Sequence, residues 1–132
     1  MIHNFNLRIY YEDTDLAGIV YYANYLKFIE RGRSSLIREL KIDQGTLKDL
    51  GFMFVVKKIS AEYHASAKLD DELKVETKLS ELSGAKILFD QSVYKGTILL
   101  FSSHVTVVLI SEKGRPVRMP IEIAEKLKQF AA

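Results

Sequence analysis

The 132-residue chain contains no cysteine, which excludes disulfide bonds, thiolate metal sites and cysteine nucleophiles. It also lacks an excess of charge of one sign: 19 lysines and arginines stand against 17 acids, a formal net charge of +2. Nucleic-acid binding through bulk positive charge is therefore not expected. Its hydrophobic runs are far shorter than the about 20 residues that cross a membrane. Residues 1–5 lack the charged-then-apolar pattern of a signal peptide, so we expect a soluble, cytoplasmic protein.

The composition that remains is that of an ordinary globular protein. Hydrophobic residues make up 48% of the chain and charged residues 27%. A chain of this length can bury a core without disulfide or metal staples. No internal repeat and no long linker is visible, so we expect a single domain over residues 1–132.

One segment has the strongest helical pattern. Its apolar side chains recur at helical spacing from Tyr22 to Leu40 and form one wide stripe, typical of a helix buried against a large, flat surface. Asn24 is a candidate cap for this helix, and a start one turn earlier is the alternative. A short helix is predicted over residues 44–50, and Pro120 is expected at the first position of a terminal helix.

Five segments show the alternation or the β-branched composition of strands. They are residues 5–12, 53–65, 72–79, 85–94 and 98–111. Short turns join the last three, which requires antiparallel pairing. The order predicts an α+β fold in which an antiparallel five-stranded sheet wraps around the long helix. One helix cannot cover five strands, so we expect a homo-oligomer to bury the remaining sheet surface and edge.

Several familiar catalytic motifs are missing from the sequence. There is no Gly-x-Ser-x-Gly elbow, no P-loop and no dinucleotide glycine fingerprint. The three histidines, His3, His64 and His104, lie far apart and lack metal-ligand spacing, so no metal site is expected. His64 and His104 fall within predicted strands, and we interpret them as structural. No pattern indicates an organic cofactor.

The unusual segment is the loop before the long helix. It holds three acids within four positions, Glu12, Asp13 and Asp15, and five of the seven tyrosines lie in or beside it. The simplest interpretation is that an acid here caps the helix. Three features favour a site instead: Gly18 permits close backbone approach, residues 19–22 give the acid a dry setting, and the helix start offers N–H groups to an anion. Such an acid can attack an acyl group or activate water while N–H groups hold the oxyanion.

The same loop carries a resemblance to a known family. Residues 13–25, DTDLAGIVYYANY, followed by ERGR at 30–33, resemble the signature of hot-dog-fold acyl-CoA thioesterases. The branch is the YbgC type, associated with the Tol–Pal system and similar to 4-hydroxybenzoyl-CoA thioesterases. Residues 54–58, 62–63 and 67–71 match that branch in order and spacing, so the resemblance covers nearly the whole chain.

The resemblance implies roles for particular residues. Asp15 is implied as the catalytic carboxylate, acting as general base or as nucleophile, and the backbone N–H of Tyr22 as the group that polarises the thioester carbonyl. Relatives often carry His where this chain has Tyr22, which matters only if the side chain acts. The family assembles as dimers and often as tetramers, with the site at a subunit interface. Candidates for supporting roles are Asp13, Gly18, Asn24 and Glu30.

Glu30 has two interpretations. Some hot-dog thioesterases use an acid on the central helix as the base. Glu30 lies eight residues after Tyr22, about 12 Å along a helix, which is far for acting on one substrate carbonyl within one subunit. An ion pair with Arg33 is therefore the favoured interpretation.

The predicted reaction converts acyl-CoA and water into a carboxylic acid and free CoA, without a cofactor. Basic candidates for binding the CoA phosphates are Lys57, Lys58, Lys68, Arg115 and Arg118. Lys57 and Lys58 should face opposite sides of their strand, so one at most would point at the ligand. The walls of the acyl pocket cannot be separated from the core by sequence.

Three alternatives stay open. Acyl carrier protein could replace CoA as the thiol carrier. A 3-hydroxyacyl dehydratase of the same fold needs a His with an acid, and no suitable His falls in the loop or at the helix start. A non-catalytic module that binds acyl carrier protein or an envelope-linked partner is disfavoured by the intact loop around Asp15.

Overall fold

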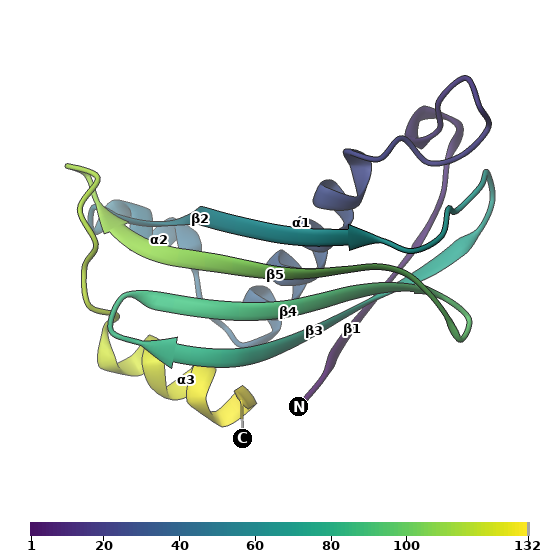
Figure 1. Cartoon of the computed structure of the whole chain (residues 1–132). Helices are drawn as coiled ribbons and strands as arrows, with labels where there is room; N and C mark the ends of the chain where they lie inside the picture. The colour runs from purple at the N-terminus through teal and green to yellow at the C-terminus, as the bar shows by residue number, and fades with distance from the viewer. Residues whose placement is uncertain (132) are drawn as a thin grey trace.

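Within the described residues, one antiparallel sheet of five strands frames the molecule (Figure 1). The computed structural model describes residues 1–131, so the last residue of the domain expected over 1–132 lies outside it. The strands are β1 (His3–Arg8), β2 (Phe52–Tyr63), β3 (Glu72–Ser83), β4 (Lys86–Lys95) and β5 (Ile98–Ser111). The helices are α1 (Asn24–Glu39), α2 (Gln44–Asp49) and α3 (Ile121–Ala131), with a 3-10 turn, η1 (Tyr11–Asp13). The predicted α+β class is confirmed.

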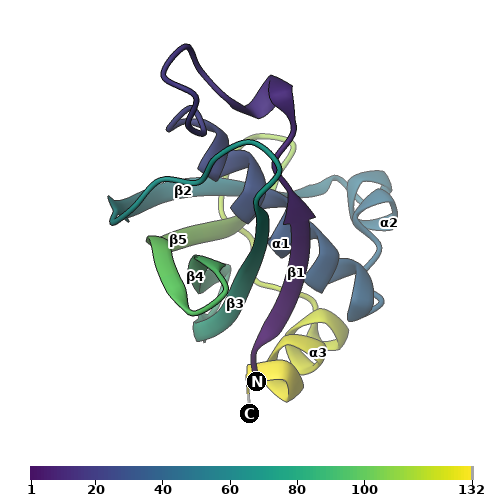
Figure 2. The same cartoon turned by 90° about the vertical axis from the view of Figure 1, so that its right-hand side faces the viewer.

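The strands lie in the order β1-β3-β4-β5-β2, and every neighbouring pair is antiparallel. Figure 2 shows the sheet curling around α1, which is the arrangement predicted from the wide apolar stripe of that helix. The stripe forms because apolar residues return every three or four positions and so share one face. The buried residues of α1 are Tyr25, Phe28, Ile29, Gly32, Leu36 and Ile37.

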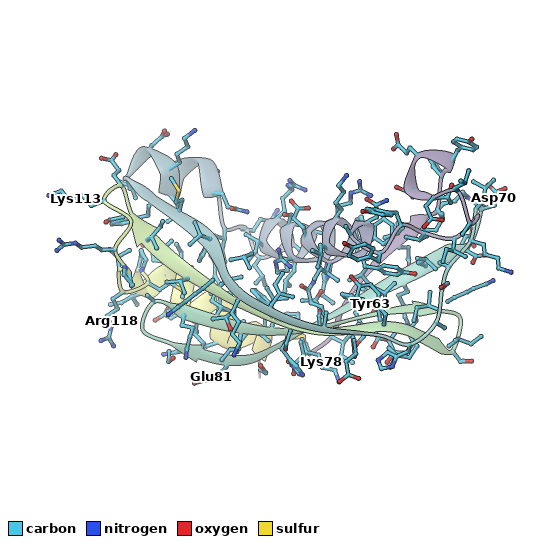
Figure 3. The ribbon with its side chains drawn as sticks, turned by 45° about the horizontal axis from the view of Figure 1, so that its top comes forward. Tyr63, Asp70, Lys78, Glu81, Lys113 and Arg118 are labelled. Carbon is cyan, nitrogen blue, oxygen red and sulfur yellow. The ribbon has the colours of Figure 1, made fainter. Side chains whose placement is uncertain are left out.

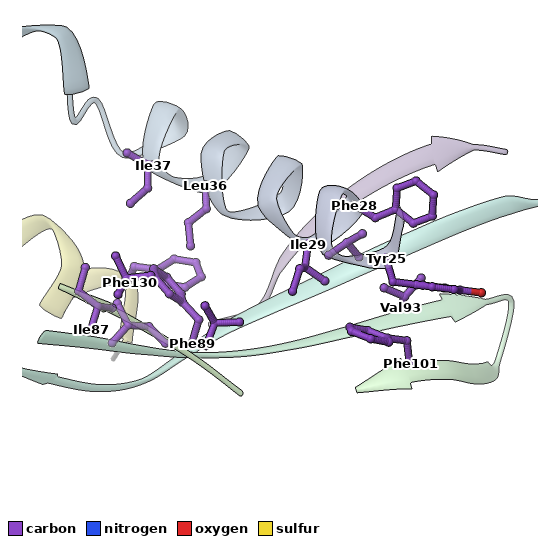
Figure 4. Packing of buried hydrophobic residues seen from close by; sticks show 14 of the residues in the cluster. Tyr25, Phe28, Ile29, Leu36, Ile37, Ile87, Phe89, Val93, Phe101 and Phe130 are labelled. Atoms are coloured by element: carbon purple, nitrogen blue, oxygen red, sulfur yellow. The ribbon is translucent and has the colours of Figure 1, made fainter. Parts of the chain in front are cut away.

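The core lies between α1 and the inner face of the sheet (Figure 4). Inward positions of the strands alternate with outward ones, as in β4, where Ile87, Phe89, Gln91 and Val93 are buried and the residues that alternate with them are partly exposed. Phe28 and Phe101 are fully buried in the same cluster. This hydrophobic layer fixes the position of α1 and, with it, of the loop that precedes the helix.

One buried polar network crosses this apolar layer. The Gln91 side-chain amide donates to the carbonyl of Ile29 at 2.8 Å and to the Thr77 hydroxyl at 2.9 Å, and its oxygen accepts from Arg33 at 3.0 Å. Burial lowers the pKa of the Arg33 guanidinium from its usual value. Because the hydrogen-bonding groups of Gln91 are paired, the network ties the middle of α1 to the sheet without leaving an orphaned amide.

The C-terminus of α1 ends in a Schellman motif that lacks the usual glycine. The N–H of Ile42 donates to Ile37 and that of Lys41 donates to Arg38, while Lys41 adopts a φ of 62°. Left-handed backbone is costly for a residue with a Cβ.

We expect Lys41→Gly to stabilise the protein by about 1 kcal/mol, measured by urea unfolding. The control is Lys48→Gly, which lies inside α2 and outside any such turn and should destabilise the protein. Stabilisation by both substitutions would contradict a specific cost of the left-handed backbone at Lys41.

The structure differs from prediction at several element boundaries, among them the end of β3, which was predicted at residue 79 and lies at Ser83. The first strand was predicted over 5–12 but ends at Arg8, because the chain turns into η1, where Tyr11 is 83% exposed. Asn24 is the first residue of α1 but caps nothing: its side-chain amide donates to the carbonyl of Asp13 at 2.9 Å. The last helix begins at Ile121, one residue after Pro120, whose carbonyl accepts the N–H of Ala124.

Strand β2 has the least cover in the fold. It lies at one edge of the sheet and pairs only with β5, so its other edge has no partner among residues 1–131. Its residues from Val56 to Tyr63 are all exposed, including Ile59 at 37%. An edge of this kind offers a row of unpaired N–H and C=O groups. No helix within the described part of the chain is long and apolar enough to span a membrane.

Candidate active site

The loop between β1 and α1 is anchored at one end of the sheet, beside the segment that joins β2 to β3 (Figure 1). The N–H of Val20 donates to the carbonyl of Ala67 at 2.9 Å, and Ile19 forms a β-bridge with Lys68. Tyr25 adds a side-chain bond, because its hydroxyl accepts the N–H of Ala67 at 3.1 Å. These contacts hold the motif that the sequence singled out against the segment between β2 and β3.

Asp13 has a structural place in this loop. Its carboxylate accepts the N–H of Tyr10 at 2.9 Å and so closes η1. Its carbonyl accepts both the N–H of Tyr21 and the side-chain amide of Asn24, each at 2.9 Å. Asp13 therefore links the two ends of the loop, and the side chain of Asn24 supplies one of the hydrogen bonds of this link.

Asp15 lies in a tight turn of its own. Its carboxylate oxygen Oδ1 accepts the N–H of Ala17 at 2.9 Å, and its backbone bonds to Ile19 and Gly18. Gly18 adopts a φ of +83°, which a side chain would strain, although a Cβ there would meet no atom within 4 Å. The glycine is thus needed to shape the turn that presents Asp15.

The Asp15 turn and the start of α1 border a common cavity of about 380 Å³. Tyr21, Tyr22, Tyr25 and Tyr63 line it together with Asp15. The dry setting expected for the acid is wrong for a single chain, because Asp15 and the ring of Tyr22 are exposed. Of residues 19–22, Val20 is buried and Ile19 is half-buried, whereas Tyr21 and Tyr22 are exposed.

The start of α1 leaves backbone donors free. In residues 1–131 no protein acceptor lies within hydrogen-bond reach of the N–H of Tyr22 or of Ala23. The carbonyl of Tyr22 accepts the hydroxyl of Tyr63 at 2.9 Å. Two free N–H groups at the positive end of a helix can stabilise a developing negative charge.

The predicted basic residues do not gather at this cavity. Lys68 lies beside the loop, where it forms a β-bridge with Ile19, a residue of the cavity lining. Lys58 pairs with Thr106 on the outer face, and Lys57 is the extra residue of a β-bulge, so simple alternation does not describe this pair. Arg118 lies at the opposite end of the sheet from Tyr63 in Figure 3.

Glu30 belongs to a different cavity. This space of about 230 Å³ lies between α1 and the inner face of β2, with walls that include Phe54 and Phe89. The ion pair predicted between Glu30 and Arg33 is wrong: in the described part of the chain no such pair lies within 4 Å. Arg33 turns to buried Gln91, and Glu30 accepts from the Ser34 hydroxyl at 3.3 Å.

Sequence reasoning missed Tyr63 and His64 at the first cavity. The place of Tyr63 follows from the strand register, since it pairs with Phe101 and lies on the inner face, but register is not readable from one sequence. His64 lies just past β2, and its Nε2 is 2.9 Å from the Ser102 hydroxyl. The other histidines have structural partners, His3 with Glu39 and His104 with Asp90. Residues 1–131 hold no cluster of three His, Cys, Asp or Glu able to bind a metal.

This fold and this loop define a hot-dog protein of the thioesterase class. The family model of the thioesterase-like superfamily matches residues 10–127, so the chain belongs to that superfamily. It is 44% identical over 122 residues to the acyl-CoA thioesterase YbgC of Haemophilus influenzae, covering 91% of this chain and 90% of that protein. It is 37% identical over 125 residues to the acyl-CoA thioester hydrolase YbgC of Escherichia coli O157:H7, covering 93% of each.

A solved structure agrees with these sequence relatives. The probable thioesterase from Bartonella henselae superposes with a TM-score of 0.85 at 36% identity, covering 91% of this chain and 100% of that one. The resemblance predicted from residues 13–25 is thereby confirmed. These likenesses extend over nearly the whole chain and so include the loop, α1 and the sheet.

Proposed function

We propose that this protein hydrolyses acyl-CoA thioesters, with Asp15 as the reacting carboxylate. The observation that supports this most is the common cavity, which joins the Asp15 turn to a helix start with two free N–H groups. The names of the Haemophilus influenzae and Escherichia coli relatives favour CoA thioesters as the substrate class.

In the proposed mechanism the N–H groups of Tyr22 and Ala23 bind the thioester oxygen and stabilise the oxyanion. Asp15 removes a proton from water, the water oxygen bonds to the carbonyl carbon, and the C–S bond breaks. The thiolate of CoA leaves and takes up a proton. The alternative is direct attack by Asp15, which forms a mixed anhydride that water then hydrolyses. In both cases the products are a carboxylic acid and free CoA, and no cofactor takes part.

The proposed active form is a homo-oligomer built on the open edge of β2. Asp15 and the ring of Tyr22 are exposed in one chain, whereas oxyanion stabilisation is strongest where water is excluded. A second copy paired along β2 would satisfy the unpaired backbone and cover exposed Val56 and Ile59. The dimer is the minimal assembly, and a tetramer formed from two dimers would bury more of the sheet.

This assembly leads to a direct prediction. Light scattering after size exclusion should give at least twice the mass of 15.1 kDa at micromolar concentration. Ile59→Pro removes a backbone N–H in the middle of β2 and should shift the mass toward the monomer and lower turnover. A matched control is Ile98→Pro at the first position of β5, where a missing N–H is better tolerated. A wild type that is monomeric at this concentration would contradict the assembly.

Binding of the CoA phosphates is proposed for basic residues near the loop and on β2. Lys68 is the leading candidate because it lies beside Ile19, at the border of the cavity. Lys57 and Lys58 lie on the strand proposed to pair with a second copy, so they could serve the neighbouring subunit's site. Arg115 and Arg118 lie past the other end of β5 and could reach a site only from another subunit.

The competing function is a non-catalytic module that binds acyl carrier protein or an envelope-linked partner. One assay separates the two: release of free thiol from short, long and aromatic acyl-CoAs and from acyl carrier protein thioesters. The chain has no cysteine, so a thiol reagent reports only the product. Turnover on CoA thioesters supports our proposal. Turnover only on acyl carrier protein thioesters would show that acyl carrier protein, and not CoA, is the thiol carrier. No turnover on any of them favours the binding module.

We propose the cytoplasm as the compartment, in keeping with the lack of disulfides.

A further inference from the structure

The side chain of Tyr63 makes a hydrogen bond to the backbone at the helix start, and this bond has no role in the proposed mechanism. Tyr63 is the last residue of edge strand β2, and its hydroxyl donates to the carbonyl of Tyr22 at 2.9 Å. That carbonyl belongs to the peptide whose N–H is that of Ala23, one of the two free donors. A hydrogen bond to a peptide oxygen polarises the peptide and strengthens its N–H as a donor.

The ring of Tyr63 is fixed by aromatic neighbours from the loop before α1, from α1 and from β5. It packs edge-on against Tyr22, Tyr25 and Phe101, with ring centroids 6.2, 5.7 and 5.0 Å apart. Phe101 is fully buried and Tyr25 is 2% exposed, so Tyr63 rests on the core while its other face remains open. The hydroxyl is therefore held on the Tyr22 carbonyl by packing.

The backbone at Tyr22 has little else to hold it. The N–H of Tyr25 also points to the same carbonyl, but at 3.4 Å, which is a weak bond. Hydrogen bonds to Asp13 hold Tyr21 and Asn24, the residues on either side of the two donors, but not the donors themselves. Burial, and then the neighbouring Tyr22, raise the pKa of the Tyr63 hydroxyl above its usual value of 10.0 and so favour the protonated form, which donates the bond.

We infer that Tyr63 is a positioning residue for the reaction, holding and polarising the Tyr22–Ala23 peptide so that its N–H serves the oxyanion. This inference rests on the proposed thioester hydrolysis. It also connects the site to the assembly, because Tyr63 lies on the strand whose free edge is proposed to pair with a second copy. Pairing along β2 would steady the donors through this one side chain.

Tyr63→Phe is the test, because it removes one oxygen and keeps the packed ring. We expect kcat to fall about two- to tenfold, the effect of one neutral hydrogen bond, with KM within twofold. The control is Tyr94→Phe on β4, whose hydroxyl has no hydrogen-bond partner in the described residues; its kcat should stay at the wild-type value. An unchanged kcat in Tyr63→Phe would overturn the inference. A fall in kcat matched by a large loss of thermal stability would overturn it too, as a purely structural effect.

A second readout does not depend on turnover. With ¹⁵N-labelled alanine, the amide proton of Ala23 should move upfield in Tyr63→Phe, because its peptide loses the bond that polarises it, and should not move in Tyr94→Phe. An unmoved Ala23 amide would overturn the inference. A wild type without turnover on any thioester contradicts the proposed function instead, and the Ala23 amide still decides whether Tyr63 polarises this peptide.

Discussion

Asp15→Asn should reduce the turnover of acyl-CoA about 10²- to 10⁴-fold, the usual contribution of a positioned acid or base. The amide is as large as the carboxylate, and its oxygen can still accept the N–H of Ala17, so the turn should survive. What is lost is basicity, and also nucleophilicity if Asp15 attacks directly. The measurement is the kcat for thiol release, with the thermal midpoint as a check that the fold is intact.

The matched comparison is Asp13→Asn, two residues earlier in the same loop. The carboxylate of Asp13 accepts the N–H of Tyr10, a role that an asparagine oxygen can also fill. We therefore expect it to cost far less than Asp15→Asn. Equal losses in both variants would show that the loop is simply sensitive to a change of charge. Full turnover in Asp15→Asn would exclude Asp15 as the reacting group.

Gly32→Ala should destabilise the protein by about 2 kcal/mol, although alanine is the better helix former by about 1 kcal/mol. A Cβ at Gly32 would lie 2.8 Å from Cγ1 of Val75 and 3.3 Å from both the Gln91 amide and the Thr77 hydroxyl. The first contact forces α1 away from β3. The others disturb the hydrogen bonds that Gln91 makes to Ile29 and Thr77.

Urea unfolding measures this loss, and the thermal midpoint should fall by about 5–10 °C. Lys27→Ala is the control on the same helix: its side chain is exposed, and its change should stay within about 0.5 kcal/mol. A Gly32→Ala variant as stable as the wild type would show that α1 can move off the sheet at little cost. That outcome would contradict the close packing that positions the helix start.

The fold could be predicted because its signals are local. The apolar stripe of α1 and the alternation in β3 each identify an element within a dozen residues, and Gly84 and Gly96 mark the short turns that make the sheet antiparallel. The first strand was overextended because Tyr11 continues the alternation, although the bond from Asp13 to Tyr10 closes a turn there. A side-chain hydrogen bond of this kind ends the strand, but it leaves the alternation of apolar and polar residues in the sequence unchanged, so the pattern does not show where the strand ends.

The site could be predicted only as far as one continuous segment carries it. Asp15, Gly18 and Tyr22 lie within eight positions and were found together. Tyr63 and the bulge at Lys57 depend on which residues face each other across β2 and β5, and a shift by one residue would reverse every side chain. Glu30 and Arg33 are correctly spaced for an ion pair, but the buried Gln91 competes for the guanidinium, and its position depends on the packed sheet.

The most direct measurement follows both products of the reaction in water enriched in ¹⁸O. Purified protein is incubated with a set of short, long and aromatic acyl-CoAs, free thiol is read with a thiol reagent, and the carboxylic acid is read by mass spectrometry. We predict equal amounts of free CoA and acid over many turnovers, with one solvent oxygen in each acid molecule. No release of CoA above the uncatalysed rate from any substrate would contradict acyl-CoA hydrolysis by this protein, as would release of CoA without an acid that carries solvent oxygen.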